Sequence, residues 1–169
     1  TGAPYCVAVN SCTMALLLAV RWHLRGQDVN AWLSRPQVEI PKRTYVGVPM
    51  SIIHAGGRPV FRDEEWTGTY QLKPLPVWDS ARRFTSGMYV RGNFICTSFH
   101  WNKTLGIQQG GAILHDDPQA DAWLRRARFD GRTEGVPLEE DSFDEPGWHA
   151  YMAPETAAAN RLMLFRSCV

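Results

Sequence analysis

The chain has 169 residues, 44% of them hydrophobic and 21% charged, which is the balance of a globular domain with a core of its own. Its formal net charge of +1, without a block of like charges, argues against nucleic acid and against a membrane surface as partners. The four cysteines are widely spread, without the paired spacing of a zinc or redox site, so we expect no metal, reduced thiols and a cytoplasmic protein.

The first elements form an arrangement that can bind an anion. We expect a strand over residues 5–10, a hydroxyl-rich turn at Ser11, Cys12 and Thr13, and a helix over residues 14–24, whose apolar run is too short to cross a bilayer. The amides and the dipole of the first helical turn would converge on a phosphate, and the turn hydroxyls could add to them. The alternative is that Ser11 or Thr13 only caps the helix.

Short strands and one helix follow. Strands are predicted over residues 38–41 and 58–63, with a helix over residues 50–56 between them, and a further apolar run at residues 76–78 ends at Asp79. Asp79 should therefore lie at the carboxyl edge of a strand, where open α/β sheets bind their ligands. A capping or surface aspartate remains the alternative.

A polar loop that holds one lysine lies between two apolar runs, residues 94–99 and 112–114, which read as strands. The loop presents Lys103 at a fixed point, with the hydroxyl of Ser98 five residues earlier and the glycine pair 110–111 allowing close approach of the backbone. A lysine held in this way suits a Schiff base to an aldehyde cofactor, because a buried amine is a better nucleophile. The alternative is a lysine on a solvated loop.

The second half of the chain also contains one hairpin and one helix with clear end signals. Residues 85–92 suggest a hairpin that leads into the lysine segment. Further on, Asp117 as N-cap and Pro118 in the first turn predict a helix that continues over residues 120–129. Residues 132–146 are acidic, lack apolar periodicity and read as a loop.

Several of these stretches resemble, in the same order, segments of the DegT/DnrJ-type sugar aminotransferases, which are pyridoxal-phosphate (PLP) enzymes of the aspartate-aminotransferase fold. The stretches are S-C-T at 11–13, T-Y at 44–45, R-P-V-F-R-D at 58–63, D-S-A at 79–81, S-F-H-W-N-K at 98–103 and G-G-A-I-L at 110–114. The resemblance implies an α/β fold with three layers, α/β/α, around a mainly parallel sheet. It also implies that residues 1–169 form a single shortened PLP-binding large domain without the family's small carboxy-terminal domain, or a fragment of a longer protein.

The resemblance also assigns site residues. PLP would be joined to Lys103 as a Schiff base, and Asp79 would pair with the ring nitrogen and keep it protonated; these are the two expected catalytic residues. Tyr45 would lie over the ring face, although without the resemblance it is equally well a core tyrosine. The cofactor phosphate would be held by Ser11, Cys12, Thr13 and Ser98.

The function implied by the resemblance is transfer of an amino group from an amino acid, expected to be glutamate, to a nucleotide-linked keto sugar, in a homodimer. Four departures from the family's pattern, together with a stretch missing after Asp63, favour a second hypothesis, a degenerate PLP-fold module that binds without turnover. The departures are Cys12, Arg82, Asp130 and Met152, the last in place of an asparagine that reaches the neighbouring subunit's cofactor. A third hypothesis is an α/β ligand-binding domain without a cofactor.

Overall fold

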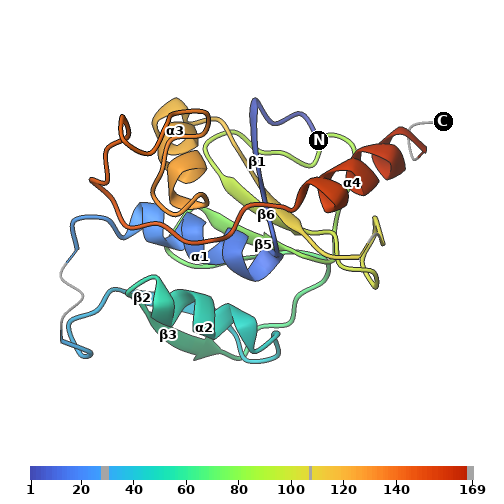
Figure 1. Cartoon of the computed structure of the whole chain (residues 1–169). Helices are drawn as coiled ribbons and strands as arrows, with labels where there is room; N and C mark the ends of the chain where they lie inside the picture. The colour runs from blue at the N-terminus through green and yellow to red at the C-terminus, as the bar shows by residue number, and fades with distance from the viewer. Residues whose placement is uncertain (28–30, 107, 167–169) are drawn as a thin grey trace.

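The computed structural model describes residues 1–27, 31–106 and 108–166, and Figure 1 shows how its elements are arranged. In chain order these are β1 (Tyr5–Val9), α1 (Cys12–His23), β2 (Gln37–Pro41), α2 (Gly47–His54), β3 (Arg58–Arg62), β4 (Tyr70–Gln71), β5 (Val77–Ser80), β6 (Phe94–Ser98), β7 (Gly111–His115), α3 (Pro118–Ala127) and α4 (Pro154–Arg166). Within these described residues, no helix is long and apolar enough to span a membrane.

The main sheet has five strands in the order β1-β7-β6-β5-β4, which confirms the α/β class. Strands β1, β5 and β6 run in one direction, whereas β7 and β4 run against their neighbours. The chain passes directly from β4 to β5 and from β6 to β7, which are neighbours in the sheet, and such direct connections between adjacent strands produce antiparallel pairs. The sheet is therefore mixed, where the sequence predicted a mainly parallel one.

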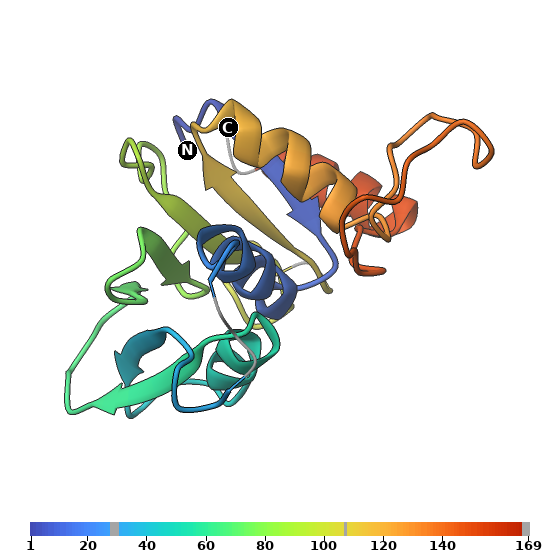
Figure 2. The ribbon, with the colours of Figure 1, turned by 90° about the vertical axis from the view of Figure 1, so that its left-hand side faces the viewer.

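Helices α1 and α3 cover one face of this sheet, and their packing forms the core (Figure 2). The first helix buries Leu18 and Val20 completely against strand residues such as Cys96 and Ile113, because its apolar side chains occupy nearly the whole circumference. Asp117 caps α3 as predicted, since its Oδ1 accepts from the amides of Gln119 at 2.8 Å and Ala120 at 3.1 Å.

The opposite face is covered mainly by the segment that precedes β6. The predicted hairpin over residues 85–92 is wrong: these residues form turns, and Met88 instead packs on Ile95 and Leu114. Near one end of the same face Met152, which precedes α4, packs on Phe99 and its neighbours. The apolar residues in 85–92 thus cover the sheet rather than pair with each other as strands.

Strands β2 and β3 form a separate parallel pair, with α2 packed between them and α1 (Figures 1 and 2). The packing of α2 on α1 and several hydrogen bonds join this small unit to the rest. Glu39 in β2 and Lys73 after β4 exchange backbone hydrogen bonds of 2.7 and 3.1 Å. The Ser51 hydroxyl of α2 donates to the carbonyl of Thr13 in the first turn of α1 at 2.9 Å. The start of α1 therefore lies where the two units meet.

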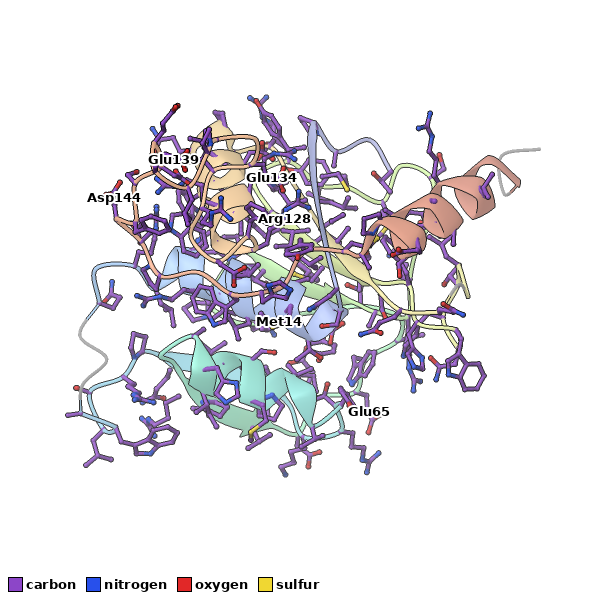
Figure 3. The ribbon with its side chains drawn as sticks, in the orientation of Figure 1. Met14, Glu65, Arg128, Glu134, Glu139 and Asp144 are labelled. Atoms are coloured by element: carbon purple, nitrogen blue, oxygen red, sulfur yellow. The ribbon has the colours of Figure 1, made fainter. Side chains whose placement is uncertain are left out.

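The acidic segment over residues 132–146 has no helix or strand, as the sequence predicted, and ion pairs tie it to the end of α3. Arg128 pairs with Glu134 at 2.6 Å and Arg126 with Asp144 at 3.8 Å; three of these four side chains, Arg128, Glu134 and Asp144, are labelled in Figure 3. The segment lies away from the junction of the two units.

Candidate active site

A cavity of about 850 Å³ lies at the junction of the two units. All seven site residues predicted from the sequence line it: Ser11, Cys12, Thr13, Tyr45, Asp79, Ser98 and Lys103. The wall comes from the start of α1, the segment before α2, the ends of β5 and β6, and the loop that leads to β7. Residues more than 90 positions apart in the sequence therefore face one space.

Asp79 is the buried acid of the cavity, with only 6% of its surface exposed. Its Oδ1 accepts from the amide of Ala81 at 2.9 Å, and its Oδ2 accepts from the hydroxyl of Tyr70 at 2.7 Å. Burial raises the pKa of Asp79, and the two hydrogen bonds and the charges of Lys103 and Arg82 lower it again only in part. A cation bound beside this carboxylate would offset the desolvation of its charge.

Lys103 lies on the loop between β6 and β7, half-buried in the cavity wall. Its amide donates to the carbonyl of His100 at 2.9 Å, so a turn fixes its backbone. Its charge lowers the pKa of both Asp79 and Cys12. The side chain of Lys103 thus lines the cavity.

The first turn of α1 supplies one wall. Ser11 is the N-cap, with its Oγ accepting from the amide of Met14 at 3.2 Å and donating to Oδ1 of Asn10 at 3.2 Å. The Ser11 hydroxyl therefore caps α1, which is the alternative that the sequence left open for this residue. The positive end of the α1 dipole still faces the cavity, because Cys12 and Thr13 line it together with Ser11.

Cys12 stands where the family's pattern has glycine, and the structure explains why a side chain is tolerated there. The close approach is made by Gly111 at the start of β7, where a Cβ would lie 2.6 Å from the Cys12 nitrogen and 2.7 Å from the Thr97 oxygen. Burial and the charge of Asp79 raise the pKa of the Cys12 thiol well above its ordinary value, so the thiol is neutral. The glycine that the close approach of α1 to the sheet requires is thus Gly111 in β7, and not a residue of the turn.

Tyr45 lies at the mouth of the cavity, with 71% of its surface exposed, so it is not a core residue. Its ring edge is close to Gly47, where a Cβ would come within 2.7 Å of Cε1. Beside it, Arg43 lines the cavity and pairs with Glu65, labelled in Figure 3, at 2.8 Å. The mouth is therefore an open rim of aromatic and charged groups.

The remaining departures from the family's pattern have different surroundings. Arg82 lines the cavity and lies 5.9 Å from the ring of Trp66. Met152 packs within its own chain, and its sulfur accepts from Nδ2 of Asn160 at 3.3 Å. Asp130 adopts a positive φ of 59° after α3 and bonds to His149 at 2.9 Å. Of these three substitutions, only Arg82 reaches the cavity.

Two cavity features were missed by sequence reasoning. Trp66 lines the wall, and Tyr70 bonds to Asp79 from strand β4, which has only two residues. The β-branched and aromatic residues Thr67, Thr69 and Tyr70 are a weak strand signal that could have found Tyr70. The hydrogen bond of Tyr70 to Asp79 could not have been found in this way, because it depends on the register of β4 with β5.

Comparisons with known proteins agree with this architecture. A family model described as the DegT/DnrJ/EryC1/StrS aminotransferase family matches residues 1–88. The structure resembles the sugar aminotransferase CalS13 from Micromonospora echinospora, with 19% identity and a TM-score of 0.75 over 98% of this chain and 57% of that one. It also resembles DesV from S. venezuelae, with 20% identity and a TM-score of 0.71 over 96% of this chain and 52% of that one.

A third similar structure is the PLP form of Spr1654 from Streptococcus pneumoniae, with 18% identity and a TM-score of 0.68 over 98% of this chain and 56% of that one. At these identities the likeness establishes the fold. The chain spans about half the length of these solved structures. The comparison with curated proteins found no match. Since the family model covers 88 of the 169 residues, the chain belongs to the DegT/DnrJ/EryC1/StrS aminotransferase family.

Proposed function

We propose that the chain forms the PLP-binding part of an aminotransferase that moves an amino group from an amino acid to a keto sugar. The observation that carries this proposal is the shared cavity, which is lined by both Lys103 and the buried Asp79. Family membership supports the reaction class, and a neighbour such as CalS13, described as a sugar aminotransferase, supports a sugar as acceptor. Glutamate as donor and a nucleotide-linked sugar as acceptor are the finer parts of the proposal.

The cavity fits PLP in charge as well as in size. Besides Lys103, it is lined by Arg43 and Arg82, whereas Asp79 is the acid of its wall. The surplus of positive charge and the positive end of α1 suit a phosphate, for which Thr13 and Ser98 offer hydroxyls beside Ser11 and Cys12. The buried carboxylate suits a protonated ring nitrogen, and an exposed Tyr45 at the mouth could lie over the ring.

The roles of the residues follow from this placement. When bound, PLP withdraws electrons from the α-carbon of the amino substrate. The carboxylate of Asp79 would pair with the protonated ring nitrogen, whose positive charge this withdrawal requires, and its burial would strengthen the pair because little water screens it. The Nζ of Lys103 would hold the cofactor at rest; once freed, it would take the proton from the α-carbon of the amino substrate as a general base and deliver it to C4′ of the cofactor as a general acid.

We further propose that a second copy of the chain completes the site in a homodimer, in the reducing environment of the cytoplasm. Large apolar side chains are exposed at the cavity and next to it in the sequence: Tyr45, which lines it, at 71%, and Val46 at 64% and Trp101 at 68%, which follow or precede lining residues. A partner surface would cover them. Cys6, Cys12 and Cys96 are free thiols, as a reducing compartment requires; Cys168 lies outside the described residues. Light scattering at two protein concentrations would reveal the dimer.

A binding module without turnover is the second candidate. The open rim favours it, because an exposed Tyr45 and a half-buried Lys103 leave the cavity accessible to water. The two candidates share the cofactor and differ in whether the amino group moves.

Titration of the purified protein with PLP tests both. We expect a visible absorption band on binding, and borohydride reduction should fix the cofactor mass on the peptide that contains Lys103. Lys103→Ala should lose the adduct, while Lys73→Ala, which changes a lysine paired with Glu64 outside the cavity, should keep it. Failure of the wild-type chain to bind PLP would sink the proposal. Release of one 2-oxoglutarate per site from added glutamate would favour the enzyme, and none would favour the module.

A further inference from the structure

A chain of hydrogen bonds leads from the mouth of the cavity to its buried acid. Tyr70, 3% exposed, lies directly opposite Asp79 in the register of β4 with β5, so both side chains share one face of the sheet. Its hydroxyl is 2.7 Å from Oδ2 of Asp79 and also bonds to Oγ1 of Thr44. The ring of Trp66 packs on the Tyr70 ring at 4.7 Å and fixes its position.

The direction of these bonds follows from the charge of Asp79. An ionised carboxylate has no proton to give, so the Tyr70 hydroxyl donates to it and must accept the proton of the Thr44 hydroxyl. The other carboxylate oxygen accepts from the Ala81 amide. Each oxygen of Asp79 thus has one donor aimed at it, which favours the ionised form and fixes the plane of the carboxylate.

We propose that Tyr70 is a positioning residue of the site, which orients Asp79 toward the ligand, keeps it ionised, and ties it to the segment that carries Tyr45. Thr44 immediately precedes Tyr45, so the relay joins the residue proposed to hold the ring nitrogen to the residue proposed to lie over the ring face. Asp79 belongs to the main sheet, whereas Thr44 and Tyr45 lie in the segment between β2 and α2, and Tyr70 bonds to both Asp79 and Thr44. This inference rests on the proposed function and names a residue that the family resemblance did not assign.

Other charged and titratable groups also face Asp79. Lys103 and Arg82 lower its pKa through their charges, whereas Cys12 and Cys96 have raised pKa values and stay neutral beside it. Burial and the charge of Asp79 raise the pKa of Tyr70, so its hydroxyl remains a donor over the working pH range. Tyr70 is therefore a donor whose charge state does not change when Asp79 titrates.

The first test measures the pKa of Asp79 in the cofactor-free protein by carbon-13 NMR of its carboxyl group, assigned with Asp79→Asn. Tyr70→Phe removes the hydroxyl and keeps the ring, and it should raise the pKa of Asp79 by about one to two. Thr44→Val should raise it by a smaller amount, because it only weakens the donor. Tyr5→Phe, whose ring stacks on His115 away from the cavity, should leave it unchanged. An unchanged pKa in a folded Tyr70→Phe variant would overturn the inference.

The second test uses the holoenzyme. Tyr70→Phe should weaken PLP binding by about tenfold and move the pH at which the absorption of the bound cofactor changes, and Thr44→Val should do both to a lesser extent. If Tyr70→Phe fails to fold, the effect of Thr44→Val on the pKa of Asp79 and on PLP binding decides the role of Tyr70, since this variant leaves the buried ring in place. If the wild-type chain binds no PLP, the proposed function fails, but the pKa of Asp79 in the cofactor-free protein still decides the role of Tyr70.

Discussion

Replacement of Gly111 by alanine should disrupt the cavity by displacing the start of α1, which forms one of its walls. The new Cβ would lie 2.6 Å from the nitrogen of Cys12, 2.7 Å from the carbonyl carbon of Ser11 and 2.7 Å from the oxygen of Thr97. All three are backbone atoms of α1 and β6, so none can turn away as a side chain would. To reach an ordinary contact of 3.4 Å, the start of α1 must move away from the sheet by roughly 0.8 Å.

We expect Gly111→Ala to lower the free energy of unfolding by about 2 to 3 kcal/mol, which corresponds to a fall in Tm of about 5 to 10 °C for a chain of this length. PLP affinity should fall as well, because the displaced turn carries Cys12 and Thr13. Urea unfolding and PLP titration measure the two effects. Gly57→Ala is the matched control: its Cβ would meet mainly the side chains of Ile52 at 2.9 Å and Leu24 at 3.2 Å, and these can give way. Equal losses in the two variants would refute the argument from backbone crowding.

Three further predictions concern titration, capping and the buried acid. Burial lowers the pKa of His23 from its ordinary 6.5 to about 4, so the stability that depends on the neutral ring is complete above pH 6.5 and is lost as pH falls toward 4. His23→Leu should therefore flatten this part of the acid unfolding curve, by at most about 3 kcal/mol. Some dependence should persist, because burial lowers the pKa of His115 as well. Asp117→Ala should cost about 1 kcal/mol in urea unfolding because α3 loses its cap, whereas Gln119→Ala should cost less. Asp79→Asn should weaken PLP binding about 10- to 100-fold. Without cofactor, however, this variant should be at least as stable as the wild type at pH 7. The reason is that the pKa of Asp79 is raised, so its ionisation disfavours the folded state as pH rises. A cofactor-free variant that is clearly less stable would contradict this.

Elements with local signals were predictable from the sequence. Asp117 and Pro118 fix the start of α3, and the apolar runs of β6 and β7 lie where they were expected. Elements that depend on distant partners were not. The sequence could not show that residues 85–92 would cover a sheet face, because Met88 finds its partners only in the folded chain. It likewise could not show that β2 and β3 would pair apart from the main sheet.

The candidate site shows the same division. Family resemblance pointed to seven residues, and folding brings all seven to one cavity, although their roles remain proposals. Tyr70 carried no such signal, since its meaning depends on lying across from Asp79 in a strand of two residues. The degree of exposure was also beyond sequence reasoning: Tyr45 lies at an open rim, while Asp79 is almost fully enclosed.

The cavity lies between the main sheet and the smaller unit, which are joined by the backbone exchange of Glu39 with Lys73, by the Ser51 hydroxyl and by the bond between Tyr70 and Thr44. Any molecule held there touches the main sheet through Asp79 and the smaller unit through the segment of Thr44 and Tyr45. A bound molecule therefore holds the two units together, and its binding free energy adds to the free energy needed to separate them. The stretch that connects β3 to β4 should accordingly become harder for a protease to cut once the cavity is filled.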